Sequence, residues 1–174
     1  MGQQLLLNSV FRNKLSELDL VFRREADFSS IEALQQGELG GSDKIQILTY
    51  AVHVGLASLL QAEGITPQAV LGHSVGEISA AVVAGCLTSE EGAVIVARRA
   101  NLYTQVQGRG AMALVALPFE EVALELGGGR DIVAAVKSSP LTCVVSGTKG
   151  EVGAYVHQLE DRGIETWRVN TDIA

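Results

Sequence analysis

Hydrophobic and polar residues follow a helical period through much of the first hundred positions. The clearest case lies between residues 44 and 63, where apolar side chains recur every three or four positions, at Ile45, Leu48, Val52, Leu56, Leu59 and Leu60. Ser42 is placed to cap the start of this segment and Gly64 to end it. The pattern predicts a core helix over 44–63.

Weaker patterns predict the neighbouring elements. They indicate a helix over 4–18, a connecting loop over 27–43 and a short buried strand over 69–71. A buried helix over 76–84 and a long helix over 89–107 follow. Thr88 and Glu91 have the spacing of a capping box, which supports the start of the last helix. We expect the strand 69–71 to lead directly into a tight turn.

The pattern changes to short elements after the glycines at 108 and 110. It predicts strand 111–117, helix 119–126, strand 131–136, strand 142–146, helix 149–162 and strand 165–169. This βαββαβ order is typical of ferredoxin-like modules. We therefore expect a large first lobe over 1–110, a small subdomain over 111–170, and a return to the large lobe at 171–174.

Composition narrows the class of protein. With 47% hydrophobic and 19% charged residues the chain is typical of a compact globular protein, and a net charge of −7 disfavours nucleic acid as a partner. The longest apolar runs, 80–84 and 111–117, are too short to span a membrane, and the start shows no export signal, so a cytoplasmic protein is expected. Cys86 and Cys143 lie in apolar surroundings and are expected to be buried free thiols.

A Gly-x-Ser-x-Gly motif, Gly72-His73-Ser74-Val75-Gly76, lies between the predicted strand 69–71 and the predicted helix 76–84. This context favours a nucleophile elbow, in which the Ser74 hydroxyl projects from a sharp turn. The helix that follows would direct its amino end at the site, so the backbone N–H of Val75 is a candidate oxyanion donor.

The six residues from Gly72 to Glu77 resemble the corresponding motif of malonyl-CoA:acyl carrier protein transacylases and of the acyltransferase domains of type I polyketide and fatty acid synthases. Four further stretches are similar to the family pattern: Lys44-Ile45-Gln46, Val96-Ala97-Arg98-Arg99, Ser138-Ser139-Pro140 and Val144-Val145-Ser146-Gly147. Ser138 departs from the family, which has Asn there.

The resemblance implies an α/β fold, with an incomplete α/β-hydrolase-like large lobe and an inserted ferredoxin-like small lobe. It also implies that Ser74 takes an acyl group from an acyl-CoA and passes it to the phosphopantetheine thiol of an acyl carrier protein, beside other synthase domains. No metal or permanently bound cofactor is expected. Arg99 would bind the carboxylate of a malonyl group, with Gln46 as a second substrate-binding residue. Val75 favours malonyl over methylmalonyl.

The resemblance places the general base, a histidine, beyond Ala174, and the oxyanion-hole glutamine before Met1. His53, His73 and His157 do not fit the role of the base, so we expect the isolated chain to be a poor catalyst.

Two alternatives stay open. An α/β-hydrolase such as a thioesterase would use Ser74, Asp131 and His157 as its triad. Alternatively, the chain is a non-catalytic structural fragment whose glycines only form a turn, and Ser74 would then be packed away from solvent.

Overall fold

The computed structural model describes residues 2–37, 40–169 and 173–174. The chain forms two compact units, Met1–Thr104 and Gln105–Ala174. The predicted lobe boundary at 108–110 lies a few residues after this division. Ile173 and Ala174 group with the second unit, while 171 and 172 lie outside the described residues, so the return to the large lobe at 171–174 stays a prediction.

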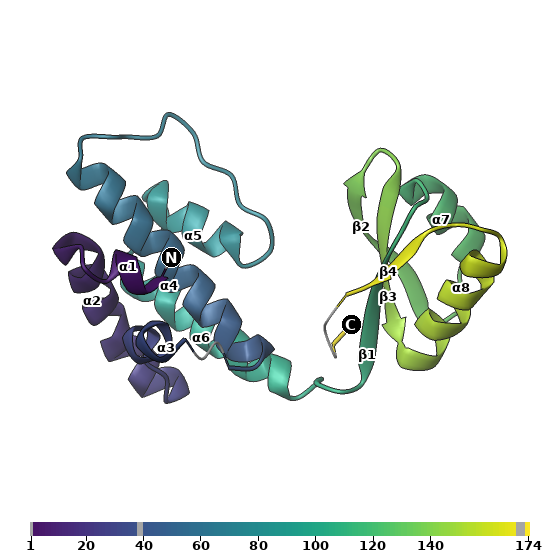
Figure 1. Cartoon of the computed structure of the whole chain (residues 1–174), viewed down its shortest axis with the longest axis horizontal. Coiled ribbons are helices and arrows are strands. Elements are labelled where there is room, and N and C mark those ends of the chain that lie inside the picture. Colours follow the sequence, from purple (N-terminus) through teal and green to yellow (C-terminus); the bar gives the residue numbers. More distant parts are fainter. Residues whose placement is uncertain (1, 38–39, 170–172) are drawn as a thin grey trace. The chain divides into compact units, whose positions relative to one another are not determined.

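The first unit is helical in the part of the chain that the structure describes. Its helices are α1 (Gly2–Leu5), α2 (Ser9–Ala26), α3 (Ser30–Gln36), α4 (Ser42–Ala62), α5 (Gly76–Val83) and α6 (Ser89–Thr104). Helices α2, α4 and α6 pack against one another, and α5 lies against α4 and α6 beneath the long connection that leaves α4 (Figure 1). The centre of this packing is a buried apolar cluster that includes Phe11, Leu15, Phe22, Ile47, Tyr50 and Val96.

The predictions for residues 4–43 were wrong in two respects. The helix expected over 4–18 is divided, because the Asn8 side chain accepts hydrogen bonds from the N–H groups of Val10 (2.9 Å) and Phe11 (3.2 Å) and starts α2 there. Helix α3 lies inside the stretch expected to be a loop. Its start is fixed by the buried carboxylate of Asp19, which accepts hydrogen bonds from the hydroxyls of Ser29 (2.5 Å) and Ser30 (2.6 Å).

The predicted helices over 44–63 and 89–107 are confirmed as α4 and α6. The cap predicted at Ser42 was wrong, because α4 begins at Ser42 itself and the residue in the cap position is Gly41, which has no side chain to form a cap hydrogen bond. Helix α4 ends at Ala62, and Gly64, two residues later, has a φ of 78°, the left-handed conformation that glycine adopts readily and that often follows a helix end. The capping box is formed as expected, because Glu91 accepts hydrogen bonds from the N–H (2.8 Å) and the hydroxyl (2.9 Å) of Thr88. These bonds also lower the pKa of Glu91.

Helix α4 is long and apolar enough to pass a length-and-hydropathy test for a membrane span over 43–62. Its packing accounts for this composition: Ile47, Tyr50 and Ala51 are almost wholly buried against the other helices. The Tyr50 hydroxyl donates a hydrogen bond to the carbonyl of Ser89 (2.7 Å) at the start of α6, and burial raises the pKa of Tyr50. Helix α4 is therefore the central core helix of the first unit.

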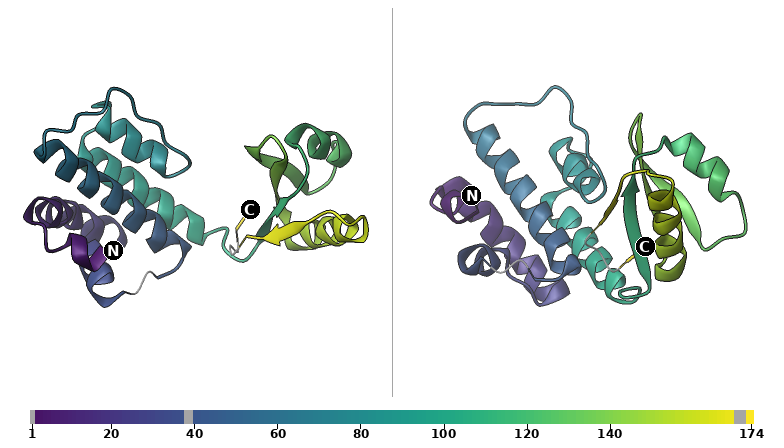
Figure 2. Two further views of the ribbon diagram at one scale, coloured as in Figure 1. Left: turned by 45° about the horizontal axis from the view of Figure 1, so that its top comes forward. Right: turned by 45° about the vertical axis from the view of Figure 1, so that its right-hand side comes forward.

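The second unit contains the predicted βαββαβ order of elements. They are β1 (Gly110–Val115), α7 (Phe119–Leu126), β2 (Ile132–Ser139), β3 (Thr142–Thr148), α8 (Lys149–Asp161) and β4 (Thr166–Arg168). The strands form one antiparallel sheet in the order β2-β3-β1-β4. Both helices cover the same face of the sheet (Figure 2). A second core lies between the helices and the sheet, with Val115, Val145 and Leu159 fully buried.

The two cysteines differ in environment. Both are free, as predicted. Cys143 is buried in β3, which raises the pKa of its thiol. The prediction that Cys86 is buried was wrong: it is exposed, because Gly85, with a φ of 77°, ends α5 and turns the chain outward just before it.

Candidate functional site

The strand predicted before the Gly-x-Ser-x-Gly motif does not form. Residues 65–73 are an extended connection without regular structure, and Leu71 is 93% exposed. A strand needs a neighbouring strand to satisfy its backbone groups, and the described part of the first unit contains no strand. The apolar run Ala69-Val70-Leu71 therefore has the composition of a strand without the hydrogen-bonded partner that would make it one.

The turn that carries Ser74 forms all the same. Ser74 has a φ of 54°, a left-handed conformation that among the described non-glycine residues it shares with Asp27 alone. Two backbone hydrogen bonds close the turn: the N–H of Gly76 donates to the carbonyl of His73 (2.9 Å), and the N–H of Glu77 donates to the carbonyl of Ser74 (3.0 Å). This is the strained geometry of a nucleophile elbow.

Gly72 is required by the close approach of the two sides of this turn. A methyl group at Gly72 would lie 2.3 Å from the carbonyl carbon of Gly76 and 2.4 Å from the nitrogen of Glu77. At Gly76 itself an added methyl would meet nothing within 4 Å. The first glycine of the motif, rather than the second, is therefore the one that the local structure of this chain demands.

The turn exposes Ser74 at the amino end of α5. The serine is solvent-exposed, and Val75 is the residue that immediately precedes the helix. Its N–H donates to none of the backbone carbonyls among the described residues, as is usual for the first N–H groups of a helix. The Val75 side chain packs against the core of the first unit, so what this residue offers at the turn is its backbone.

Arg99 and Gln46, two residues singled out in the sequence, are in contact. The Arg99 guanidinium donates a hydrogen bond through Nη1 to the Gln46 side-chain oxygen, which joins α6 to the second turn of α4. Through Nη2 it donates to the hydroxyl of Tyr103 (2.8 Å), and its Cζ lies 4.8 Å from the centre of the Tyr103 ring. Tyr103 did not stand out in the sequence, although its position four residues after Arg99 on a helix is the spacing that brings two side chains together.

The partners of Arg99 are neutral. Within the described residues no carboxylate lies within 4.0 Å of its guanidinium, whereas the adjacent Arg98 is exposed and pairs with Glu25 at 2.9 Å, which lowers the pKa of Glu25. Arg99 is only partly exposed. It is thus a partly buried cation held in place by neutral groups, an arrangement that suits the binding of an external anion.

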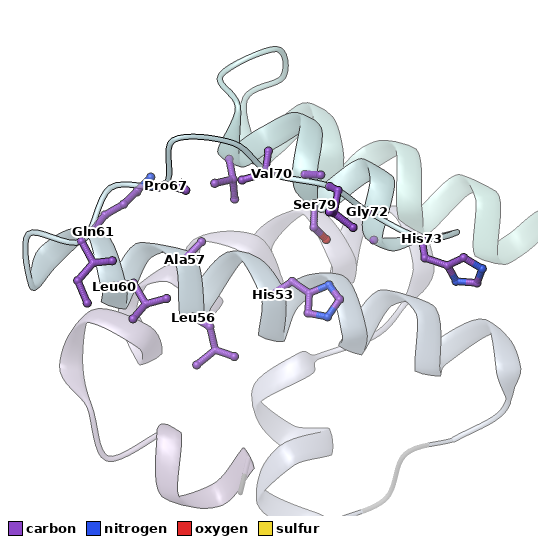
Figure 3. Close-up of a pocket in the computed structure, with 15 residues that line it drawn as sticks. His53, Leu56, Ala57, Leu60, Gln61, Pro67, Val70, Gly72, His73 and Ser79 are labelled. Carbon is purple, nitrogen blue, oxygen red and sulfur yellow. The ribbon is translucent and has the colours of Figure 1, made fainter. Parts of the chain in front are cut away.

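An apolar cavity of about 520 Å³ lies between α4, α5 and the connection 65–73 (Figure 3). Leu56, Ala57, Leu60 and Val70 are among its lining residues, and His53 and His73 lie at its wall. The hydroxyl of Ser79 is buried there without a hydrogen-bond partner. Ser74 and Arg99 are not part of the lining, so this cavity is adjacent to the elbow and separate from the two chemical groups described above.

Asp131 and His157, the acid and the base of the alternative triad, form no ion pair with each other in the described part of the second unit. His157 is exposed on α8, and its Nε2 lies 3.8 Å from Asp161, one turn further along the same helix. Asp131 is exposed just before β2 and belongs, like His157, to the second unit. Among the described residues no group of three His, Cys, Asp or Glu side chains could hold a metal ion.

The two family-like stretches of the second unit lie in its β2–β3 hairpin. Ser138 is exposed, while the hydroxyl of Ser139 lies 2.8 Å from that of Thr142 and accepts a hydrogen bond from the N–H of Leu141 (3.1 Å) across the turn. Gly147 lies where a methyl group would be 2.2 Å from the carbonyl oxygen of Asp131. Within this unit, Ser139 and Gly147 therefore shape the hairpin.

Comparison with known proteins shows the family of the chain. The family model described as "Acyl transferase domain" matches residues 1–174. The chain is 53% identical over 174 residues to mellein synthase of Phaeosphaeria nodorum and 53% identical over 173 residues to 6-methylsalicylic acid synthase of Aspergillus terreus. It covers 10% of the length of each of these proteins.

A solved structure shows the same fold. The acyltransferase domain of the polyketide synthase PpsC of Mycobacterium tuberculosis matches with a TM-score of 0.91 and 32% identity, over 100% of this chain and 54% of that one. The family match and these relatives favour an acyltransferase over the thioesterase alternative. The chain belongs to the acyl transferase domain family, and its relatives are the acyltransferase regions of polyketide synthases.

Proposed function

We propose that this chain is the part of a polyketide synthase acyltransferase that accepts the acyl group. The acyltransferase would transfer a malonyl group from coenzyme A to an acyl carrier protein. The observation that carries the proposal is the exposed Ser74 in a left-handed conformation at the amino end of α5. Such a conformation costs free energy in a non-glycine residue. Its presence in the motif supports a nucleophile over a turn that only connects two elements.

In the proposed reaction the Ser74 Oγ attacks the thioester carbonyl carbon of the acyl-CoA while its proton passes to a general base. The C–S bond then breaks, the coenzyme A thiolate leaves and takes up a proton, and an acyl-serine ester is left. In the second half the phosphopantetheine thiol of the carrier protein gives its proton to the base and its sulfur attacks the ester carbonyl. The C–Oγ bond breaks, the acyl group stays on the carrier thiol, and the Ser74 Oγ takes up a proton. The N–H of Val75, which has no backbone acceptor in the part of the chain that the structure describes, would stabilise the oxyanion of each tetrahedral intermediate.

Malonyl is the proposed acyl group because Arg99 offers a cation that no carboxylate of the described residues pairs with. A guanidinium stays charged at any physiological pH and binds a carboxylate through two parallel hydrogen bonds. Gln46 would act by holding Arg99, with which it is in contact. An acetyl group has no carboxylate and would gain nothing from this cation, so Arg99 would select for a malonyl-type substrate.

We further propose that the first unit is part of an α/β-hydrolase-like lobe and the second a ferredoxin-like small lobe, in a cytoplasmic synthase. The elbow supports the first assignment, and the antiparallel order β2-β3-β1-β4 supports the second. Acyl carrier protein and the other synthase domains would be its partners.

The test is acyl loading from radiolabelled malonyl-CoA in a complete synthase that contains this sequence. Ser74→Ala should abolish labelling, whereas the matched variant Ser16→Ala, at an exposed serine of α2, should retain it. Mass spectrometry of a peptide containing Ser74 should locate the malonyl ester. Label that persists in the Ser74→Ala protein, or that is found on another residue, would refute the proposal.

A further inference from the structure

We infer that Tyr103 is a positioning residue for Arg99, and that it sets how strongly the site selects an acyl group with a free carboxylate. The inference rests on the proposed function, because it assumes that Arg99 binds the substrate carboxylate. It adds a residue to that site which neither the motif nor the spacing of the sequence indicated. Tyr103 would act through the guanidinium, without being the group that reacts.

The two contacts of Tyr103 restrain Arg99 in different ways. The guanidinium lies over the ring, with 4.8 Å between Cζ and the ring centroid, and this cation–π contact limits where the cation can lie. The hydroxyl accepts a hydrogen bond from Nη2 at 2.8 Å and fixes the position of that nitrogen. Because Gln46 accepts from Nη1, both terminal nitrogens are held by neutral oxygens.

The arrangement leaves the cation able to bind a ligand. A guanidinium has five N–H donors, and the bonds to Gln46 and Tyr103 use one on each terminal nitrogen. The other donors have no protein acceptor among the described residues. A long arginine side chain loses considerable conformational entropy when it is ordered. Because Gln46 and Tyr103 order Arg99 in the free protein, substrate binding does not carry this cost and the contact with the substrate carboxylate is stronger.

Removal of one restraint at a time tests the inference in the complete synthase. Tyr103→Phe keeps the ring over which the guanidinium lies and removes the hydroxyl, and we expect KM for malonyl-CoA to rise about three- to tenfold, the worth of one hydrogen bond. Tyr103→Leu removes both contacts and should raise it further. The rate of loading from acetyl-CoA, which has no carboxylate to bind, should stay within about twofold of the parent protein in both variants. Leu102→Ala, at an exposed neighbour on the same helix, is the matched control and should change neither.

The outcomes separate this inference from the proposed function. Arg99→Leu should lower the preference for malonyl-CoA over acetyl-CoA, while Arg98→Leu, its exposed neighbour, should not. If Arg99→Leu leaves the preference unchanged, the proposed role of Arg99 fails and the role of Tyr103 fails with it. If Arg99→Leu lowers the preference but neither Tyr103 variant does, the inference about Tyr103 alone is overturned. Equal losses with malonyl-CoA and acetyl-CoA in the Tyr103 variants would show a merely structural role and would also overturn it.

Discussion

The two units differ in whether their extended apolar segments have a neighbouring strand to hydrogen-bond with. In the second unit every described strand has a hydrogen-bonded neighbour, and β1, at the centre, pairs with β3 on one side and β4 on the other. In the first unit the apolar run before the elbow has no neighbouring strand among the described residues, and Leu71 is 93% exposed. The helices of the first unit nevertheless form, because their caps and packing are supplied within it. The comparison teaches that helices are specified locally, whereas a strand exists only where its partner does.

The largest effect is expected from a cavity in the self-contained sheet unit. Leu159 of α8 is fully buried in the second core, so Leu159→Ala should lower the free energy of unfolding of that unit by about 2–5 kcal/mol. Fluorescence of Trp167, the single tryptophan of the chain, should report the loss during urea unfolding. Hydrogen exchange should show lost protection in 110–168 and unchanged protection in α4. Equal loss of protection in both units would contradict their independence.

A smaller effect is expected at the turn that carries Ser74, which forms although the described part of the first unit contains no strand. Gly72→Ala forces a methyl group against the backbone of Gly76 and Glu77 and should cost about 1–3 kcal/mol, comparable to overpacking of a core. It should also reduce acyl loading of Ser74, because the turn must open. Gly76→Ala is the matched variant: it has space and lies in a helix, where alanine is favoured. Equal destabilisation by the two variants, measured by urea unfolding followed by circular dichroism, would show that the turn is not held by this close approach.

A third effect depends on pH and is confined to the second unit. Glu125 of α7 accepts hydrogen bonds from Arg162 (2.8 and 3.0 Å) and from the Tyr155 hydroxyl (2.9 Å), and the Arg162 bonds hold its pKa below the ordinary value of 4.5. Folding lowers this pKa, so the stabilisation is complete above the unfolded value and is lost as the pH falls through the folded value. Since both side chains are about one-third exposed, we expect about 1 kcal/mol or less.

The control for this pH effect is Glu125→Gln. The variant should be less stable than the parent chain at neutral pH, and the difference should shrink as the pH falls through the lowered pKa of the parent Glu125 and this glutamate takes up its proton. Trp167 fluorescence again reports the second unit. A difference that stays constant with pH would show that the ionised carboxylate contributes nothing beyond packing.

The sequence predicted those parts of the fold that depend on nearby residues. The capping box of Thr88 and Glu91, the glycine end of α4 and the βαββαβ order all follow from short-range patterns, and all are confirmed. The start of α3 was missed because Asp19 reaches Ser29 and Ser30 across ten and eleven residues, which no local pattern reveals. The separation of α1 from α2 was missed although its cause, the cap at Asn8, is short-range. For the candidate site, the motif located Ser74, but the contact of Arg99 with Gln46 spans 53 residues and follows only from the packing of α6 on α4.

The smallest effect is expected where the sequence predicted a buried strand. Leu71→Ser should change the free energy of unfolding of this chain by no more than about 0.5 kcal/mol, because a side chain that is already 93% exposed loses almost no burial when it becomes polar. Its matched partner is Leu48→Ser in α4, where the side chain is 5% exposed and the polar hydroxyl would be buried at a cost of several kcal/mol. A large loss in Leu71→Ser would mean that Leu71 is covered in solution, and the contrast between an unpaired strand in one unit and a complete sheet in the other would then fail.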